Sequence, residues 1–261
     1  MQFIKNISAM GRVYKLGACL LVALALASGA VAGDVGRSYA VGVEDLQYYP
    51  LHTTTKANVF GGFAREVLDA FAKRQGYTFR YVPLPINRLY VAFLQEQSVD
   101  FKYPDNPKWK EALRRSLPIH YSASVITSEE GALVLPKNKG RSIKSLGTAL
   151  GFTPWPYLAA IDSKAIVLTT SNGFDGLLRH ALAEHIDAIY VNIDVANYLL
   201  AEELNAPGGL VFDPGLPHAR SDFSLSTLRH PEVVAEFDAF LQREHGLLQK
   251  IREKYKLEER R

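Results

Sequence analysis

Residues 98–124, SVDFKYPDNPKWKEALRRSLPIHYSAS, decide the fold that the sequence predicts. The stretch contains a short strand at 99–102, a turn rich in Pro, Asp and Asn, a short basic segment, and a second extended run at 119–121. The chain on each side has a similar order of elements, in which a helix ends shortly before an apolar-Asp-apolar strand. Those strands contain Val99-Asp100-Phe101 and Ile186-Asp187-Ala188. We therefore interpret the stretch as the crossing between two α/β lobes.

The amino-terminal side alternates between strands and helices. Strands are predicted at 38–43, 78–82 and 99–102, and amphipathic helices at 63–74 and 86–96. Strand–helix–strand units of this kind imply a parallel sheet with right-handed crossovers.

The carboxy-terminal side has the same α/β character. The predicted strands are 131–136, 165–169 and 186–191, the predicted helices are 174–184, 194–203, 230–243 and 247–255, and 221–228 is the return crossing. We therefore expect lobe 1 to comprise residues 33–124 and 222–261, and lobe 2 to comprise residues 125–221.

The first 32 residues have the composition of an export signal. Three basic residues precede an apolar run at 16–28, and Ala30-Val31-Ala32 is a small-x-small cleavage site. The apolar run is too short to span a bilayer as a stable anchor. We expect a cleaved signal peptide and a periplasmic mature protein, with an N-terminal membrane anchor as the alternative.

Removal of the leader changes both the cysteine content and the charge. Cys19 is the only cysteine, so cleavage of 32 of the 261 residues leaves 229 without disulfide or thiol chemistry. Leu16-Gly17-Ala18-Cys19 loosely resembles a lipoprotein box, but the apolar run continues beyond it. The net charge of +3 falls to zero because the leader has three basic residues and no acid. Nothing in this charge points to nucleic acid or an anionic membrane as a partner.

Several short motifs occur along the mature chain in a characteristic order. They are Val41-Gly42-Val43-Glu44, Tyr48-x-Pro50-Leu51, Gly62-Phe63, Val99-Asp100, Gly151-Phe152-Thr153, Ile186-Asp187-Ala188 and Lys254-Tyr255. In this order the chain resembles the periplasmic solute-binding proteins of amino-acid-type ABC transporters, extracellular solute-binding protein family 3. The resemblance implies a type 2 periplasmic-binding fold, in which two α/β lobes joined by two extended hinge crossings close over a ligand.

Two positions depart from this family. Its arginine for the ligand α-carboxylate is missing from the turn Pro104-Asp105-Asn106-Pro107-Lys108-Trp109-Lys110, and its acid for the α-ammonium is replaced by Asn192, five residues after Asp187. Two charge-assisted contacts at roughly 2 kcal/mol each amount to about 4 kcal/mol, on the order of a thousandfold in affinity. We therefore expect a ligand other than a free α-amino acid.

The candidate ligand-binding residues lie near strand ends and helix starts, where open α/β sheets bind ligands. Glu44 would meet a ligand cation, Tyr48 would stack on the ligand, and Trp109 would replace the missing arginine with a flat wall. The predicted set is Glu44, Tyr48, Arg88, Tyr103, Asp105, Trp109, Phe152, Thr153 and Asn192. Four of them also have a purely structural interpretation: a solvated loop acid for Glu44, a core-covering loop aromatic for Tyr48, a surface ion pair for Arg88 and a packing ring for Trp109.

The predicted function is capture of a small polar or aromatic-bearing solute by a monomer that delivers it to a membrane permease of an ABC transporter. One alternative is a ligand-sensing receptor domain acting on a membrane sensor. Another is a cyclohexadienyl-dehydratase-like enzyme using Glu44, Asp105 or Asp194. No catalytic residue, cofactor or metal site is predicted. The chain has no nucleophile elbow, phosphate loop or dinucleotide fingerprint, and His180 and His185 are expected on different sides of a helix.

Overall fold

The structure is a computed structural model that describes residues 36–114 and 116–257. The described residues from Arg37 onward form one compact unit. The predicted export signal and its cleavage site lie outside the described residues. No helix in the described ranges is long and apolar enough to cross a membrane.

The first sheet is parallel, as the alternating strands and helices predicted. Strand β1 (Ser38–Glu44) lies between β5 (Thr78–Leu84) and β6 (Phe101–Asp105). Helices α1 (Phe63–Gln75) and α2 (Ile86–Leu94) connect these strands and bury their apolar faces. The sheet and α2 are packed closely, since a Cβ on Gly42 of β1 would lie 2.6 Å from Leu89 Cδ1.

The second sheet has three parallel strands and one antiparallel neighbour. Strand β9 (Ser145–Ala149) lies between β10 (Val167–Ser171) and β11 (Ala188–Asn192), and β11 pairs on its other side with β8 (Ile126–Val134). Helix α4 (Leu158–Asp162) lies between β9 and β10 in the chain, and helix α5 (Phe174–Leu182) lies between β10 and β11.

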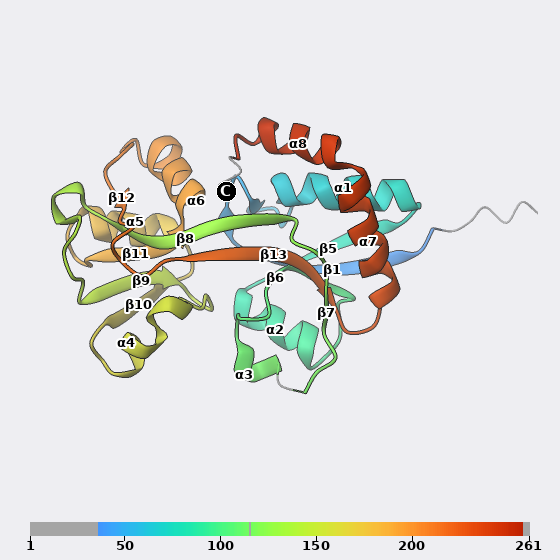
Figure 1. Ribbon diagram of the computed structural model, residues 1–261, viewed down its shortest axis with the longest axis horizontal. Helices are drawn as coiled ribbons and strands as arrows, with labels where there is room; N and C mark the ends of the chain where they lie inside the picture. The colour runs from blue at the N-terminus through green and yellow to red at the C-terminus, as the bar shows by residue number, and fades with distance from the viewer. Residues whose placement is uncertain (1–35, 115, 258–261) are drawn as a thin grey trace, which may run out of the picture. The chain divides into compact units, whose positions relative to one another are not determined.

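Two long strands join the sheets. Strand β13 (Ala219–Thr227) pairs antiparallel with β8 over its first half and with β6 over its second half. The hydrogen-bonded order is therefore β10-β9-β11-β8-β13-β6-β1-β5, and Figure 1 shows β8 and β13 running side by side between the sheets. This arrangement is the α/β, two-lobed fold predicted from the sequence. The predicted limits of the lobes, 124/125 and 221/222, remain a prediction; they fall before β8 and within β13.

Strand β8 begins five residues earlier than predicted, at Ile126 rather than Gly131. Four of the five added residues, Thr127–Glu130, are polar, so the segment did not resemble a buried strand. They form a strand because β13 supplies backbone partners from Ala219 to Phe223.

The remaining elements are short or peripheral. A small antiparallel sheet contains β2 (Gln47–Tyr48), β3 (His52–Thr54) and β4 (Phe60–Gly61). The others are α3 (Glu111–Arg114), β7 (His120–Tyr121), α6 (Ile193–Tyr198), β12 (Val211–Phe212), α7 (Pro231–Arg243), α8 (His245–Lys254), 3-10 turns at Pro136–Asn138 and Trp155–Tyr157, and a π-helical turn at Leu199–Glu203.

A buried charge cluster fixes the end of β6. The Asp105 carboxylate lies 3.0 Å from Lys102 Nζ and accepts two hydrogen bonds from the Arg114 guanidinium, at 2.5 and 2.9 Å. Ser226 Oγ of β13 donates to the same carboxylate at 2.5 Å. Burial alone would raise the pKa of Asp105, but Lys102 and Arg114 outweigh it and hold the pKa below its ordinary value.

We expect Asp105→Asn to destabilise the protein by about 3 kcal/mol or more, because it leaves Lys102 and Arg114 buried without their counter-charge. Urea unfolding measures this loss. Glu96→Gln is the matched control, because Glu96 pairs with Arg88 at the surface and its loss should change the unfolding free energy little. Equal losses in the two variants would contradict the structural role of the cluster.

Candidate functional site

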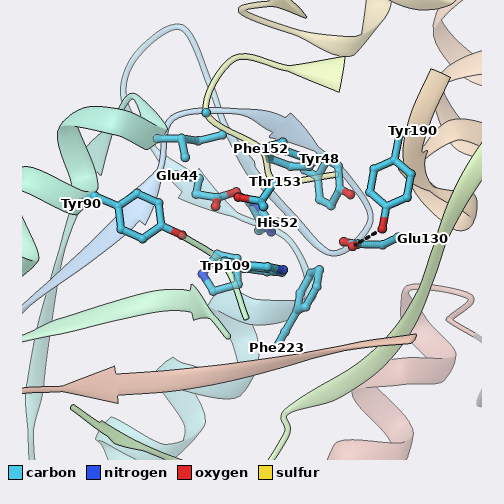
Figure 2. Close-up of a pocket in the computed structure, with 13 residues that line it drawn as sticks. Glu44, Tyr48, His52, Tyr90, Trp109, Glu130, Phe152, Thr153, Tyr190 and Phe223 are labelled. Carbon is cyan, nitrogen blue, oxygen red and sulfur yellow. Dashed lines mark hydrogen bonds and ion pairs between the residues drawn. The ribbon is translucent and has the colours of Figure 1, made fainter. Parts of the chain in front are cut away.

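A cavity lies between the two sheets, where the carboxyl ends of several parallel strands meet. The space between its lining atoms, open solvent included, is about 390 Å³. Figure 2 shows the lining, which comprises Glu44, Tyr48, His52, Ile86, Tyr90, Pro104, Trp109, Glu130, Gly151, Phe152, Thr153, Tyr190 and Phe223. Both sheets and both crossing strands contribute, as expected for a ligand site at the strand ends of open α/β sheets.

On the side of the first sheet, the cavity is lined by an acid and a histidine. Glu44 ends β1 and is 4% exposed, and its Oε2 lies 3.3 Å from Nε2 of the fully buried His52. Neither ring nitrogen of His52 has a hydrogen-bond partner among the described residues. The Tyr48 ring packs against His52 with centroids 5.1 Å apart. The small antiparallel sheet positions both rings, because Tyr48 and His52 are paired across β2 and β3.

On the side of the crossing strands, the cavity is lined by a second acid. Glu130 of β8 accepts hydrogen bonds from Ser221 Oγ at 2.8 Å and from the Tyr190 hydroxyl at 3.4 Å. All three side chains are buried. Burial raises the pKa of Glu130 to about 7, with a further contribution from the negative charge of Glu44. Glu130 can therefore be protonated or ionised near neutral pH.

Aromatic rings form most of the remaining wall. Trp109 meets Phe223 edge-on with centroids 5.4 Å apart, and Tyr48 meets Phe152 in the same way at 5.5 Å (Figure 2). Tyr90 completes the wall on the side of α2. The site thus combines flat apolar surfaces with two acids and one histidine.

Contacts between the two sides close the cavity. The Asn192 backbone N–H of the second sheet donates to the Tyr48 hydroxyl oxygen at 3.1 Å. Gly151, which follows β9 with φ 97°, packs against α2 so closely that a Cβ would lie 2.8 Å from Ile86. A ligand must therefore enter by separation of these surfaces, unless it passes through the part of the cavity that opens to solvent.

The structure brings five of the predicted residues to the cavity and leaves four away from it. Glu44, Tyr48, Trp109, Phe152 and Thr153 all line it. The four that do not are described below.

Each of those four has other contacts. Arg88 lies on the exposed face of α2 and donates two hydrogen bonds to Glu96. Tyr103 is fully buried in the hydrophobic core, and Asp105 is taken up by Lys102 and Arg114.

Asn192 caps a helix instead of reaching the ligand cavity. Its Oδ1 accepts from the Val195 N–H at 3.0 Å, at the start of α6, and its amide donates to Ser128 Oγ. The spacing from Asp187 that suggested a ligand contact places a helix cap there.

Sequence reasoning missed several lining residues, of which His52, Tyr90, Glu130, Tyr190 and Phe223 carry the most chemistry. Glu130 was missed because its polar segment was not recognised as a strand. The alternation Ile126, Ser128, Glu130, all buried on one face, was the available signal. His52 lies in a polar loop sequence, where no local pattern signals burial.

The expectation that His180 and His185 lie on different sides of a helix was wrong. Their rings lie edge-to-face with centroids 5.5 Å apart. Helix α5 ends at Leu182, and the chain turns at Glu184 with φ 61°, so helical periodicity does not extend to His185. No group of three potential metal-binding side chains occurs among the residues that the structure describes.

Comparisons with protein-family models and with curated proteins gave no match. Solved structures do match. The substrate-binding protein of an ABC uptake transporter from Streptococcus pneumoniae, with bound histidine, superposes with a TM-score of 0.67 at 22% identity, over 85% of this chain and 93% of that chain. The chain therefore has the two-lobed fold of the periplasmic binding proteins.

Two further structures have the same fold. A histidine kinase sensor domain similar to periplasmic binding proteins matches with a TM-score of 0.67 at 20% identity, over 85% of this chain and 97% of that chain. An ancestral amino-acid-binding protein, a precursor of cyclohexadienyl dehydratase, matches with a TM-score of 0.63 at 19% identity, over 84% and 95%. Proteins with different roles thus share this fold, and the site has to decide between those roles.

We expect Glu130 to make stability depend on pH. Its folded pKa is raised from the ordinary 4.5 to about 7, so the folded state binds a proton more tightly than the unfolded chain. Its contribution to stability is therefore present below pH 4.5 and is lost as the pH rises through about 7, a change of about 3 kcal/mol.

Urea unfolding between pH 4.5 and 8, with wild type and Glu130→Gln, measures this dependence. The variant should be the more stable protein above pH 7, and its stability should vary less across the range. The amide oxygen of Gln can still accept from Ser221 and Tyr190. Parallel pH profiles for the two proteins would refute the assignment.

Proposed function

We propose that the protein is a periplasmic solute-binding protein that captures a small polar or aromatic-bearing solute between its lobes and delivers it to the membrane permease of an ABC transporter. The observation that carries this proposal is the cavity between the two sheets, to which both sheets and both crossing strands contribute side chains. Hinge motion at the crossing strands would open it and close it. We further propose that the protein acts as a monomer. Its periplasmic location rests on the export signal predicted from the sequence.

The lining supports a ligand other than a free α-amino acid. None of the described lining residues is Lys or Arg, the side chains that most often bind a carboxylate. The backbone after β9 is also partly committed, because the Phe152 N–H donates to Ala149 O at 3.0 Å. Trp109 and Phe223 present flat surfaces on the other side.

A sensory role is the first alternative. It uses the same cavity and the same closure, with a membrane sensor in place of the permease. The sensor domain among the structural relatives shows that this fold can serve such a role. The genes beside this one would distinguish a permease partner from a sensor partner.

An enzymatic role has one specific observation in its favour. Glu130 is a buried acid in the cavity with a pKa raised to about 7, the kind of group that proton transfer needs. Asp105, by contrast, is neutralised by two cations and does not line the cavity.

We expect no turnover of prephenate-like compounds by the purified protein, measured by loss of substrate. Turnover that disappears in Glu130→Gln would make the enzyme the better reading.

We expect a panel of small solutes to contain one that stabilises the protein and is not a standard amino acid. A ligand at 100 times its Kd adds about 2.7 kcal/mol to the free energy of unfolding, which a thermal-shift assay detects. If no solute of any class stabilises the protein, the proposed function is wrong.

The two tryptophans allow a matched test of where that solute binds. Trp109 lines the cavity, whereas Trp155 does not and contacts Lys108. The solute should change the tryptophan fluorescence of Trp155→Phe, which keeps Trp109 at the cavity; in Trp109→Phe, only the change that closure makes at the contact between Trp155 and Lys108 should remain. The reverse pattern would place the solute elsewhere.

A further inference from the structure

The two acids of the cavity differ in how their charge is balanced. Glu44 has His52 beside it and feels the charge of Lys102, which lies behind the aromatic wall. Glu130 has no ion pair with any described residue, and the two hydrogen bonds described for it both end on Oε2. A carboxylate accepts about four hydrogen bonds, so Glu130 retains acceptor capacity. When it is ionised, Glu130 is thus a buried acid without a positive partner among the described residues.

The two acids also act on each other. The charge of Glu44 contributes to the raised pKa of Glu130, which means that the two carboxylates repel across the cavity. Figure 2 shows them reaching it from different sides, with Tyr48 and His52 between them. A cation placed in the cavity would be attracted to both and would remove this repulsion.

The two buried cations beside the aromatic wall do not fill that role. Lys102 and Arg114 both bind Asp105, and Lys102 Nζ also donates to Pro104 O at 2.5 Å. Lys102 Nζ lies 4.7 Å from the Tyr90 ring centroid and 5.7 Å from that of Trp109. This cluster lies against Tyr90 and Trp109, and neither Lys102 nor Arg114 lines the cavity.

His52 adds a requirement for hydrogen-bond donors. Its side chain is buried and both ring nitrogens lack a hydrogen-bond partner among the described residues. A neutral imidazole has one acceptor nitrogen, which a ligand N–H could satisfy. Two acids and no Lys or Arg on the described lining favour a cation over an anion.

The aromatic wall is compatible with the same ligand class. Tyr48, Tyr90, Trp109 and Phe223 surround the cavity, and the faces of such rings attract cations. A ligand carboxylate, by contrast, would face Glu44 and Glu130 with no Lys or Arg on the lining to offset the repulsion.

We propose that the cavity binds an organic cation that bears N–H groups and has no carboxylate, such as a protonated amine or a guanidinium compound. The cationic group would lie among Glu130, Glu44 and His52, with the rest of the ligand against the aromatic wall. This inference rests on the proposed function and specifies its solute.

Matched pairs of compounds that differ only in the carboxylate test this inference. The pairs are arginine and agmatine, lysine and cadaverine, histidine and histamine, and phenylalanine and phenethylamine, each titrated by calorimetry into the full mature protein. At least one amine should bind ten times more tightly than its parent amino acid, or better. Its N-trimethylated analogue, which has no N–H on the charged nitrogen, should bind about tenfold more weakly than the amine.

Three variants locate the charge that is recognised. Glu130→Gln and Glu44→Gln should each weaken binding of that amine by tenfold or more. Glu96→Gln, which removes a carboxylate at the surface of the same protein, should leave it unchanged. Cooperative thermal unfolding shows that each variant is folded; if one is not, the matched pairs in the unmodified protein decide the question.

The outcomes separate the two proposals. If an amino acid binds as tightly as its amine, or if the ligand found is neutral or anionic, the cation inference is overturned and the solute-binding function stands. If no solute of any class binds, both fail.

Discussion

The Asp105 carboxylate, held between Lys102 and Arg114, is the interaction on which the arrangement of the two sheets depends. It lies at the end of β6 and is also bonded to Ser226 of β13, the strand that continues into the pairing with β8. A buried carboxylate without these partners would lose the solvation that an exposed one has. The cluster therefore joins the edge of the first sheet to the crossing strand at a position where misplacement would be strongly penalised.

The same cluster holds part of the cavity wall. Arg114 donates to the Trp109 carbonyl at 2.5 Å and to the Tyr90 hydroxyl at 3.3 Å, so its guanidinium positions two rings of the wall. The cavity and the crossing are thus supported by one set of contacts. This explains why Lys102 and Arg114 are not available to the ligand, although they support the aromatic surface.

Two buried acids show how differently one residue class can be used. Asp105 is surrounded by cations, which hold its pKa below the ordinary value, whereas burial without a cation raises the pKa of Glu130 to about 7. The charge and hydrogen-bond partners of Asp105 are therefore supplied by the protein itself. Glu130 can still accept hydrogen bonds and lines the cavity, so in our proposal ligand recognition depends on it.

The sequence by itself determined the alternation of strands and helices and the parallel pairing around β1, because these follow from local periodicity. Its resemblance to a solute-binding family, together with motifs at strand ends, singled out five residues that line the cavity, Glu44, Tyr48, Trp109, Phe152 and Thr153. Only the tertiary structure decided the roles of Asp105, Asn192 and Arg88, since each depends on a partner or an exposed face that spacing does not specify. It also decided that Glu130 and His52 line the cavity. Their polar segments become buried because β13 pairs with β8, and because the small sheet turns His52 inward toward Glu44. Such long-range pairing leaves no local signal for His52, and for Glu130 it leaves only the alternation Ile126, Ser128, Glu130.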